Sequence, residues 1–211
     1  MNQIMILTIG RQFGSGGRLI GKKLADVFGI AYYDKELFQL ASRESGLSHD
    51  VFEKADEKAA DRLAYLFSRG LSYMGMYTPQ LDILSNEGLF KIQSDAIRKL
   101  AETESCVIVG RCADYILRDH PNCISFFIHS DLESRIQRVV ERQQVSVEQA
   151  KELIFKTDKS RAAYYDYFTN KTWGKASSYH LSVNASVLGI KDTVAFMKAF
   201  VEKRMQKPLH I

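Results

Sequence analysis

The residues best suited to chemistry form a glycine-rich segment near the N-terminus, Gly14-Ser15-Gly16-Gly17-Arg18. An apolar, β-branched run of strand length at residues 4–9 precedes it, and residues 19–28 follow with the hydrophobic spacing of a helix. A strand, a glycine loop and a helix in this order lay successive backbone N–H groups around a phosphate and point the positive end of the helix at it. The segment therefore predicts a phosphate-binding loop.

Two nucleotide-binding fingerprints compete for these glycines. The dinucleotide fingerprint G-x-G-x-x-G is matched at Gly14 and Gly16, but its third glycine is Leu19. Asp34 nevertheless lies at about the right distance downstream for a ribose-binding acid. A glycine turn that merely connects a strand to a helix is the non-functional interpretation of the same residues.

The P-loop fingerprint G-x-x-x-x-G-K-[ST] is also incomplete. With its last glycine at Gly16, the residue at its first glycine is Arg11. Its lysine then becomes Gly17, and its hydroxyl residue becomes Arg18. Arg18 is the candidate to replace the missing lysine, because a guanidinium can bind phosphate oxygens bidentately.

Arginines recur at helical spacing in the second half of the chain. Arg135, Arg138 and Arg142 stand at i, i+3 and i+7 and therefore share one face of a helix. Arg161 lies in the next expected helix, three residues after Asp158. Phosphoryl transfer requires cations around the transferring group. The structural alternatives are a solvated helix face and an ordinary ion pair between Asp158 and Arg161.

The hydrophobic pattern indicates strands that alternate with helices and would position these groups. Strands are expected at residues 4–9, 30–34, 106–109, 124–128 and 179–183, and helices at 19–28, 35–43, 85–101, from 130, at 146–167 and at 192–204. This alternation implies right-handed crossovers and a parallel sheet covered on both faces. Ligands of such sheets bind at the carboxyl ends of the strands, which points to the glycine loop, Asp34 and Gly110-Arg111.

The composition is that of an ordinary globular protein of 211 residues, with 45% hydrophobic residues and a formal net charge of +4. No basic stripe with interleaved aromatic residues predicts nucleic-acid binding, and no run approaches the ~20 apolar residues of a membrane helix. The start of the chain lacks a signal-peptide pattern, and the odd set Cys106, Cys112 and Cys123 is typical of reduced thiols. We therefore expect a cytoplasmic protein that acts on a small molecule, with its oligomeric state left open.

Several of these motifs together resemble one known family. They are residues 12–18, Tyr32-Tyr33-Asp34, Gly110-Arg111 and the arginines of the later helices. The sequence resembles the cytidylate kinase-like family, a branch of the nucleoside monophosphate kinases within the P-loop class. The resemblance implies an α/β fold of the P-loop NTPase type, three layers α/β/α around a five-stranded parallel sheet. It also implies a single kinase-like domain over 1–211, with its core at 1–46 and 105–211 and an inserted helical, acceptor-binding lobe at 47–104.

The same resemblance implies ATP as phosphoryl donor, Mg²⁺ as its metal and a nucleotide as acceptor. The donor phosphates would be bound by Gln12, Phe13, Gly14, Ser15, Gly16, Gly17 and Arg18, with Ser15 as a magnesium ligand. The acceptor would be bound by Asp34, Arg111 and Asp158. Catalysis would depend on Arg18, Arg135, Arg138 and Arg161. The sequence departs from the family's pattern at two positions, with Gly17 in place of the lysine and Arg18 in place of the hydroxyl residue that binds magnesium.

We therefore expect an ATP-dependent phosphotransferase, a cytidylate-like nucleoside monophosphate kinase whose loop lacks the usual lysine. Because that lysine is absent, a non-catalytic nucleotide sensor on the same fold is an alternative. A nicotinamide-dependent oxidoreductase is a third alternative, against which Leu19 argues. For Asp34 the alternative role is to cap the helix that follows. The resemblance also implies an arginine-rich lid over the site. The aromatic residues around Trp173 could stack a base, and the alternative is that they pack this lid against the core.

Overall fold

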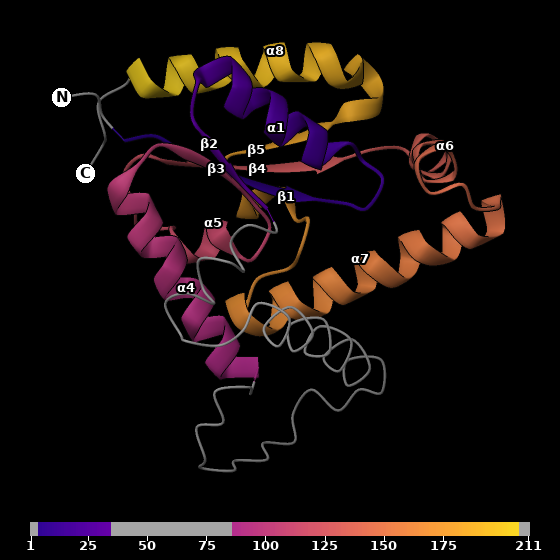
Figure 1. The fold of residues 1–211 in the computed structure, drawn as a ribbon, viewed down its shortest axis with the longest axis horizontal. Helices are drawn as coiled ribbons and strands as arrows, with labels where there is room; N and C mark the ends of the chain where they lie inside the picture. The colour runs from indigo at the N-terminus through magenta and orange to yellow at the C-terminus, as the bar shows by residue number, and fades with distance from the viewer. Residues whose placement is uncertain (1–3, 35–85, 207–211) are drawn as a thin grey trace.

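A five-stranded parallel sheet forms the centre of the computed structural model, which describes residues 4–34 and 86–206 (Figure 1). The strands are β1 (Ile6–Arg11), β2 (Ala31–Tyr33), β3 (Cys106–Val109), β4 (Cys123–His129) and β5 (Leu181–Asn184). Their order is β2-β3-β1-β4-β5, and each neighbouring pair is parallel. The predicted α/β fold with a five-stranded parallel sheet is confirmed.

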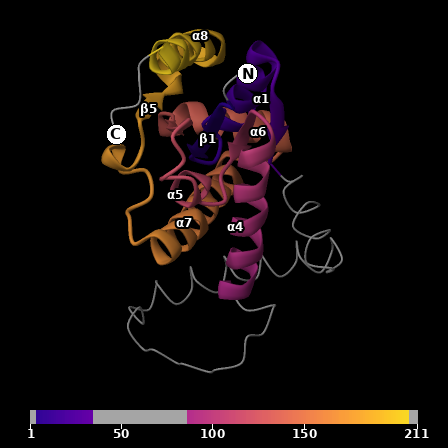
Figure 2. The same ribbon diagram turned by 90° about the vertical axis from the view of Figure 1, so that its left-hand side faces the viewer.

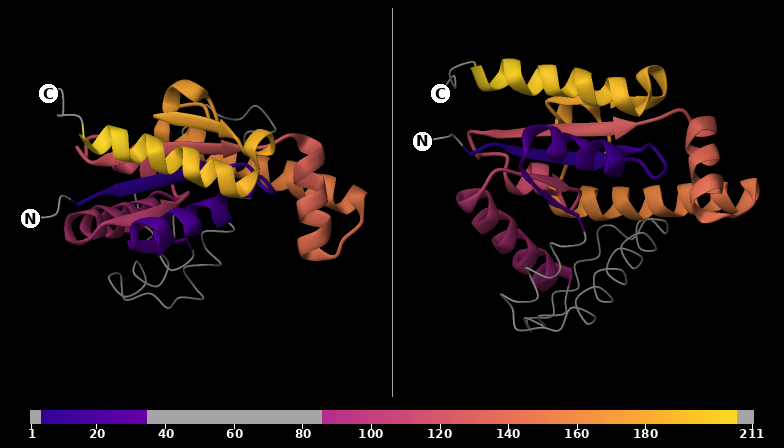
Figure 3. Two further views of the ribbon diagram at one scale, coloured as in Figure 1. Left: turned by 90° about the horizontal axis from the view of Figure 1, so that it is seen from above. Right: turned by 45° about the horizontal axis from the view of Figure 1, so that its top comes forward.

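Helices cover both faces of this sheet and give the predicted three layers. The helices α1 (Gly17–Phe28) and α8 (Ala185–Gln206) lie on one face, and α4 (Asn86–Thr103), α5 (Ala113–Ile116) and α7 (Val147–Thr169) lie on the other (Figures 1 and 2). The helix α6 (Leu132–Gln143) follows β4 and lies beyond its carboxyl end (Figure 3). No helix within residues 4–34 and 86–206 combines the length and apolar character needed to cross a membrane.

The two faces of the sheet are built by the alternation of side chains along each strand. On β1, Leu7 and Ile9 pack with Ile20 and Leu24 of α1, whereas Ile6 belongs to the core cluster on the opposite face. All five of these side chains are fully buried. Burial of such a side chain contributes about 1.5–3 kcal/mol, so the alternating pattern fixes which face of β1 receives α1. It thereby fixes where the glycine loop between them lies.

Some boundaries differ from those predicted. The last helix was expected from residue 192 but begins at Ala185, and Gly189 interrupts it with a non-helical φ of 71°. The last strand begins at Leu181 rather than at Tyr179, and the four-residue helix α5 was not predicted. The expected helix at 35–43 and most of the expected acceptor lobe at 47–104 lie outside the described residues. The division into a core and an acceptor lobe therefore stays a prediction.

The thiols of Cys106 and Cys123 provide a first test of this core. They lie on β3 and β4, on either side of Ile6, and both are buried. Burial raises the pKa of each thiol to about 12. At pH 8 about one thiol in ten thousand is then a reactive thiolate. We expect neither cysteine to react with a disulfide reagent in the folded protein, and both to react in urea, as read by peptide mass spectrometry. Rapid labelling of the folded protein would contradict this core.

Candidate phosphate-binding site

The carboxyl ends of the strands open into a pocket of about 930 Å³, a volume typical of ligand sites. The glycine loop, the residues after β2 and β3, and helices α6 and α7 line it. Among the described residues, the charged ones that line it are Arg11, Arg18, Asp34, Arg111, Asp114, Arg138, Glu141, Arg142, Lys156 and Arg161. Seven of these are cations and three are carboxylates, so the lining favours an anionic ligand.

The glycine loop has the backbone conformation that a phosphate cradle needs. Gly14 and Gly16 have φ values of 77° and 85°, in the left-handed region that glycine adopts without strain. Gly16 caps the N-terminus of α1, and its carbonyl accepts the N–H of Ile20 at 2.9 Å. Gln12, Phe13, Gly14, Gly16, Gly17 and Arg18 all line the pocket. The predicted strand, loop and helix are therefore present at the expected place.

Ser15 differs from its neighbours in this loop. Its side chain is fully buried, and it does not line the pocket. The hydroxyl donates to the carbonyl of Gln12 at 2.9 Å and accepts the N–H of Gly17 at 3.3 Å. Its oxygen therefore shapes the loop from within, and this geometry does not favour the predicted role of Ser15 as a magnesium ligand.

Asp34 was predicted to bind the acceptor, and its carboxylate, a second possible oxygen ligand for magnesium, is paired with two arginines. Its Oδ2 lies 2.6 Å from Nε of Arg18, and its Oδ1 lies 3.6 Å from Nη2 of Arg11. Within residues 4–34 and 86–206, no three His, Cys, Asp or Glu side chains cluster as a metal site. The described residues therefore do not fit a magnesium ion held by the protein itself. The predicted capping role of Asp34 concerns a helix outside the described residues.

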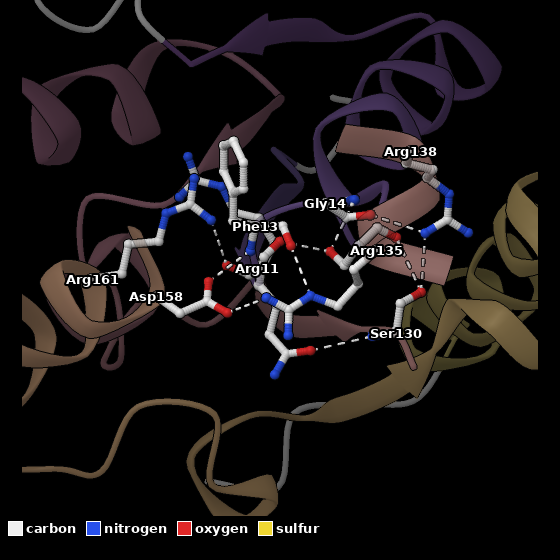
Figure 4. A network of polar contacts seen from close by, with 11 residues as sticks. Arg11, Phe13, Gly14, Ser130, Arg135, Arg138, Asp158 and Arg161 are labelled. Carbon is white, nitrogen blue, oxygen red and sulfur yellow. Dashed lines mark hydrogen bonds and ion pairs between the residues drawn. The ribbon is translucent and has the colours of Figure 1, made fainter. Parts of the chain in front are cut away.

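Helices α6 and α7, called the lid helices below because they border the pocket, are tied to the glycine loop by a buried ion pair (Figure 4). Oδ1 of Asp158 on α7 accepts the N–H of Phe13 at 2.7 Å, and Asp158 is paired with Arg135 of α6. Nε of Arg135 donates to the carbonyl of Phe13 at 2.8 Å. Asp158 thus pairs with Arg135 on another helix, and not with Arg161 on its own helix as the spacing suggested. Neither Arg135 nor Asp158 lines the pocket, so they hold the loop in place.

Two other predicted arginines reach the pocket from these helices. Arg138 donates to the carbonyl of Gly14 at 3.0 Å and to the hydroxyl of Ser130 at 3.2 Å. Arg161 donates to the carbonyl of Arg11 at 3.0 Å, and its guanidinium lies 5.6 Å from the centre of the Phe13 ring. Burial, followed by the charge of Arg11, lowers the pKa of Arg161. An anion bound between Arg161 and Arg11 would reduce the repulsion between their charges.

The turn after β3 holds Arg111 in the pocket. Gly110, Arg111 and Cys112 are three consecutive residues with positive φ, at 79°, 59° and 53°. The left-handed conformation costs a residue other than glycine roughly 1–2 kcal/mol, and such strain collects at functional sites. Asp114 follows in α5 and accepts a hydrogen bond from the hydroxyl of Tyr165 at 2.7 Å, and burial raises the pKa of its carboxyl group. Sequence reasoning did not identify Asp114 as a pocket residue.

The aromatic residues near the lid pack on the sheet and also border the pocket. The ring of Phe127 on β4 lies 5.2 Å from that of Trp173, edge to face, and 5.0 Å from that of Tyr179. These contacts agree with the packing alternative. Trp173 and Tyr179 line the pocket as well, together with Tyr164 and Tyr165.

Arg11 is a second pocket residue to which the sequence reasoning assigned no role. It appeared only as a mismatch to the first P-loop glycine, yet its side chain is only 20% exposed and faces Asp34. Arg18, which was expected to replace the lysine, has a side chain that is 57% exposed and bound to Asp34. The sequence feature that could have identified Arg11 is its position at the end of the strand that leads into the loop.

Comparison of the whole chain with known proteins gives distant relatives. Cytidylate kinase from Methanopyrus kandleri is 22% identical over 96% of this chain and 96% of that protein. Cytidylate kinase from Methanothrix thermoacetophila is 24% identical over 93% of this chain and 98% of that protein. Both relatives are therefore similar along almost their full lengths.

Solved structures and a family model complete the comparison. An uncharacterized protein from Eubacterium ventriosum is 30% identical, with a TM-score of 0.69 over 94% of this chain and 98% of that chain. Shikimate kinase from Acinetobacter baumannii, at 13% identity and a TM-score of 0.51 over 98% of this chain and 97% of that chain, shares the fold. A model of the cytidylate kinase-like family matches residues 6–187. Because that match covers most of the chain, the protein belongs to the cytidylate kinase-like family.

Proposed function

We propose that the protein is an ATP-dependent phosphotransferase that phosphorylates a nucleoside monophosphate, with CMP as the first acceptor to test. The observation that carries this proposal is the shared pocket. A glycine loop in phosphate-binding conformation and arginines from two strand ends and two lid helices all line it. Phosphoryl transfer needs this combination of anion-binding backbone and surrounding cations. The cytidylate kinases among the relatives support the choice of acceptor.

The proposed reaction assigns each group a separate task. Backbone N–H groups of the loop would bind the donor phosphates, and Arg111 would bind the phosphate of the acceptor. An acceptor phosphate oxygen then bonds to the γ-phosphorus of ATP, and the bond to the β–γ bridging oxygen breaks, leaving its electron pair on ADP. Arg138 and Arg161 would neutralise charge on the transferred group. Arg135 and Asp158 would position the loop through Phe13.

Magnesium would enter this site with its nucleotide. It keeps most of its waters and binds phosphate oxygens readily, so it does not require a dedicated set of protein ligands. When bound, it would supply positive charge to the donor phosphates. The engagement of Ser15 and Asp34 within the protein supports this assignment.

The function is tested by a coupled assay that measures ADP release from ATP with each nucleoside monophosphate in turn, with and without Mg²⁺. Magnesium-dependent turnover with one or more acceptors is expected. Nucleotide binding without turnover would instead support the sensor, and NADH binding without phosphoryl transfer would support the oxidoreductase.

Replacing Arg111 with alanine is expected to weaken acceptor binding selectively. Loss of a charge-assisted hydrogen bond costs about 1.5–3 kcal/mol, which predicts a rise of roughly 10- to 150-fold in the KM for the acceptor. The dissociation constant of ATP, measured by calorimetry, should stay unchanged. Arg118→Ala is the matched control, because that arginine is 46% exposed and paired with Asp119 on the surface. Unchanged constants for both substrates in Arg111→Ala would contradict the assignment.

A further inference from the structure

We propose that Arg11 supplies the phosphate-binding cation that the P-loop fingerprint places at residue 17. This inference rests on the proposed phosphotransferase activity and names a residue for it. It concerns two glycines, Gly17 in the loop and Gly110 after β3, which lie against different parts of the Arg11 side chain. The terminal phosphates of a nucleoside triphosphate are the ligand that this arginine would bind.

The stem of Arg11 explains why residue 17 is a glycine. A Cβ at position 17 would lie 2.6 Å from Cβ of Arg11 and 3.2 Å from its Cγ. The first distance is shorter than nonbonded carbon atoms allow, so a lysine at position 17 and an arginine at position 11 exclude each other. The loop has therefore exchanged the position of its cation, from the start of α1 to the end of β1, and has not simply lost it.

The head of Arg11 lies on the acceptor side of the pocket. A Cβ on Gly110 would lie 2.0 Å from Nη1 of Arg11 and 3.0 Å from its Cζ, so the guanidinium rests directly on that glycine. Gly110 immediately precedes Arg111, the residue proposed to bind the acceptor phosphate. The side chain of Arg11 therefore extends from the donor loop to the glycine that precedes the proposed acceptor arginine, between the two proposed phosphate sites.

The charges around Arg11 favour an anion at this point. Its pairing with Asp34 is loose, at 3.6 Å, and the same carboxylate lies 2.6 Å from Arg18. Burial, together with the charges of Arg111 and Arg18, lowers the pKa of Arg11, whereas Asp34 raises it. A buried cation among like charges gains more from an incoming phosphate than an exposed one does. Arg18 is 57% exposed and lies at the loop–helix junction, so we assign the role to Arg11.

Arg11→Met tests the charge while keeping a stem of similar shape against Gly17. We expect kcat to fall about 10²- to 10³-fold, the loss seen when one preorganised donor to a developing charge is removed. Calorimetry with ATP and with inorganic tripolyphosphate should show at least tenfold weaker binding of both. The melting temperature should not fall, because the charge removed is crowded by like charges. The control is Arg98→Met, an exposed arginine of α4 paired with Asp95.

A swap of the two side chains gives a second test. Gly17→Lys alone should be impaired by the clash with Cβ of Arg11, and Arg11→Gly alone should lack the cation. The double variant Arg11→Gly/Gly17→Lys removes the 2.6 Å contact with Cβ of Arg11 and returns a cation to the fingerprint position. The contact that remains, 3.2 Å from Cβ of Ile128, requires a shift of only a few tenths of an ångström. Because residue 17 is the first residue of α1, a lysine meets no backbone strain there. We expect the double variant to be at least tenfold more active than either single variant.

The measurement of tripolyphosphate binding tests this inference separately from the proposed function. If the wild-type protein transfers no phosphoryl group to any acceptor, the proposed function fails, and tripolyphosphate binding still decides the role of Arg11. Wild-type affinity for tripolyphosphate in Arg11→Met would overturn the inference. If the wild-type protein is active, a second result would also overturn the inference. That result is a double variant that folds as the wild type does but is no more active than either single variant.

Discussion

Replacing Gly14 with alanine is expected to lower kcat/KM in the phosphotransferase assay by about a hundredfold or more, the loss that a misplacement of roughly 1 Å can cause. The residue has a φ of 77°, which costs alanine about 1–2 kcal/mol. A Cβ there would also lie 2.9 Å from the carbonyl oxygen of Arg135 and 3.1 Å from Cγ2 of Val139. The loop would have to move away from α6, which would displace the N–H groups proposed to bind the donor phosphates.

Gly29→Ala is the matched control for this change. Gly29 has a φ of 63°, comparable to that of Gly14, but a Cβ there would have no neighbour within 4 Å. It caps the C-terminus of α1 and does not line the pocket. Backbone strain should cost each variant about 1–2 kcal/mol of stability in urea, and Gly14→Ala should lose more because its Cβ also meets the carbonyl oxygen of Arg135. Activity should fall in Gly14→Ala and persist in Gly29→Ala. Equal activity in the two variants would show that the loop is not the phosphate cradle.

The sheet was predictable because each strand carries its own local signal. Residues 106–109 are wholly apolar and become a strand buried along its length, and the alternation of strands with helices implied the parallel order. The start of α8 was not predictable in the same way. Gly189 breaks the helical pattern, and the turn from Ala185 before it is helical because the chain must leave β5 and cross to α1. Such short connections depend on packing and not on periodicity.

The candidate site was predictable where topology alone places a residue. The loop and Arg111 follow strands whose carboxyl ends meet, so both line the pocket. The role of Arg11 was not predictable, because it depends on Gly17 and Gly110 approaching the same side chain in three dimensions. Helical spacing likewise suggested an ion pair between Asp158 and Arg161, but Asp158 pairs with Arg135 on another helix.

Breaking the Arg135–Asp158 pair should produce a large loss of stability. The side chains are only 7% and 16% exposed, and Asp158 also accepts the N–H of Phe13. Asp158→Ala leaves a buried guanidinium without its carboxylate and a loop N–H without its acceptor. Removal of one partner from a buried ion pair costs about 3–5 kcal/mol, which urea unfolding will measure. Arg135→Met should cost a similar amount for the reciprocal reason.

The double variant Arg135→Met/Asp158→Leu decides whether the pair acts as a unit. With both charges removed, no buried charge is left unpaired, so the loss should be smaller than the sum of the single losses by about 2 kcal/mol or more. Lys198→Ala is the control, because its exposed i,i+4 pair with Glu202 should contribute only about 0.3–0.5 kcal/mol. Additive losses would mean that Arg135 and Asp158 hold Phe13 independently. A strong coupling would mean that α6 and α7 clamp the loop together, so that movement of either lid helix must move the phosphate-binding backbone with it.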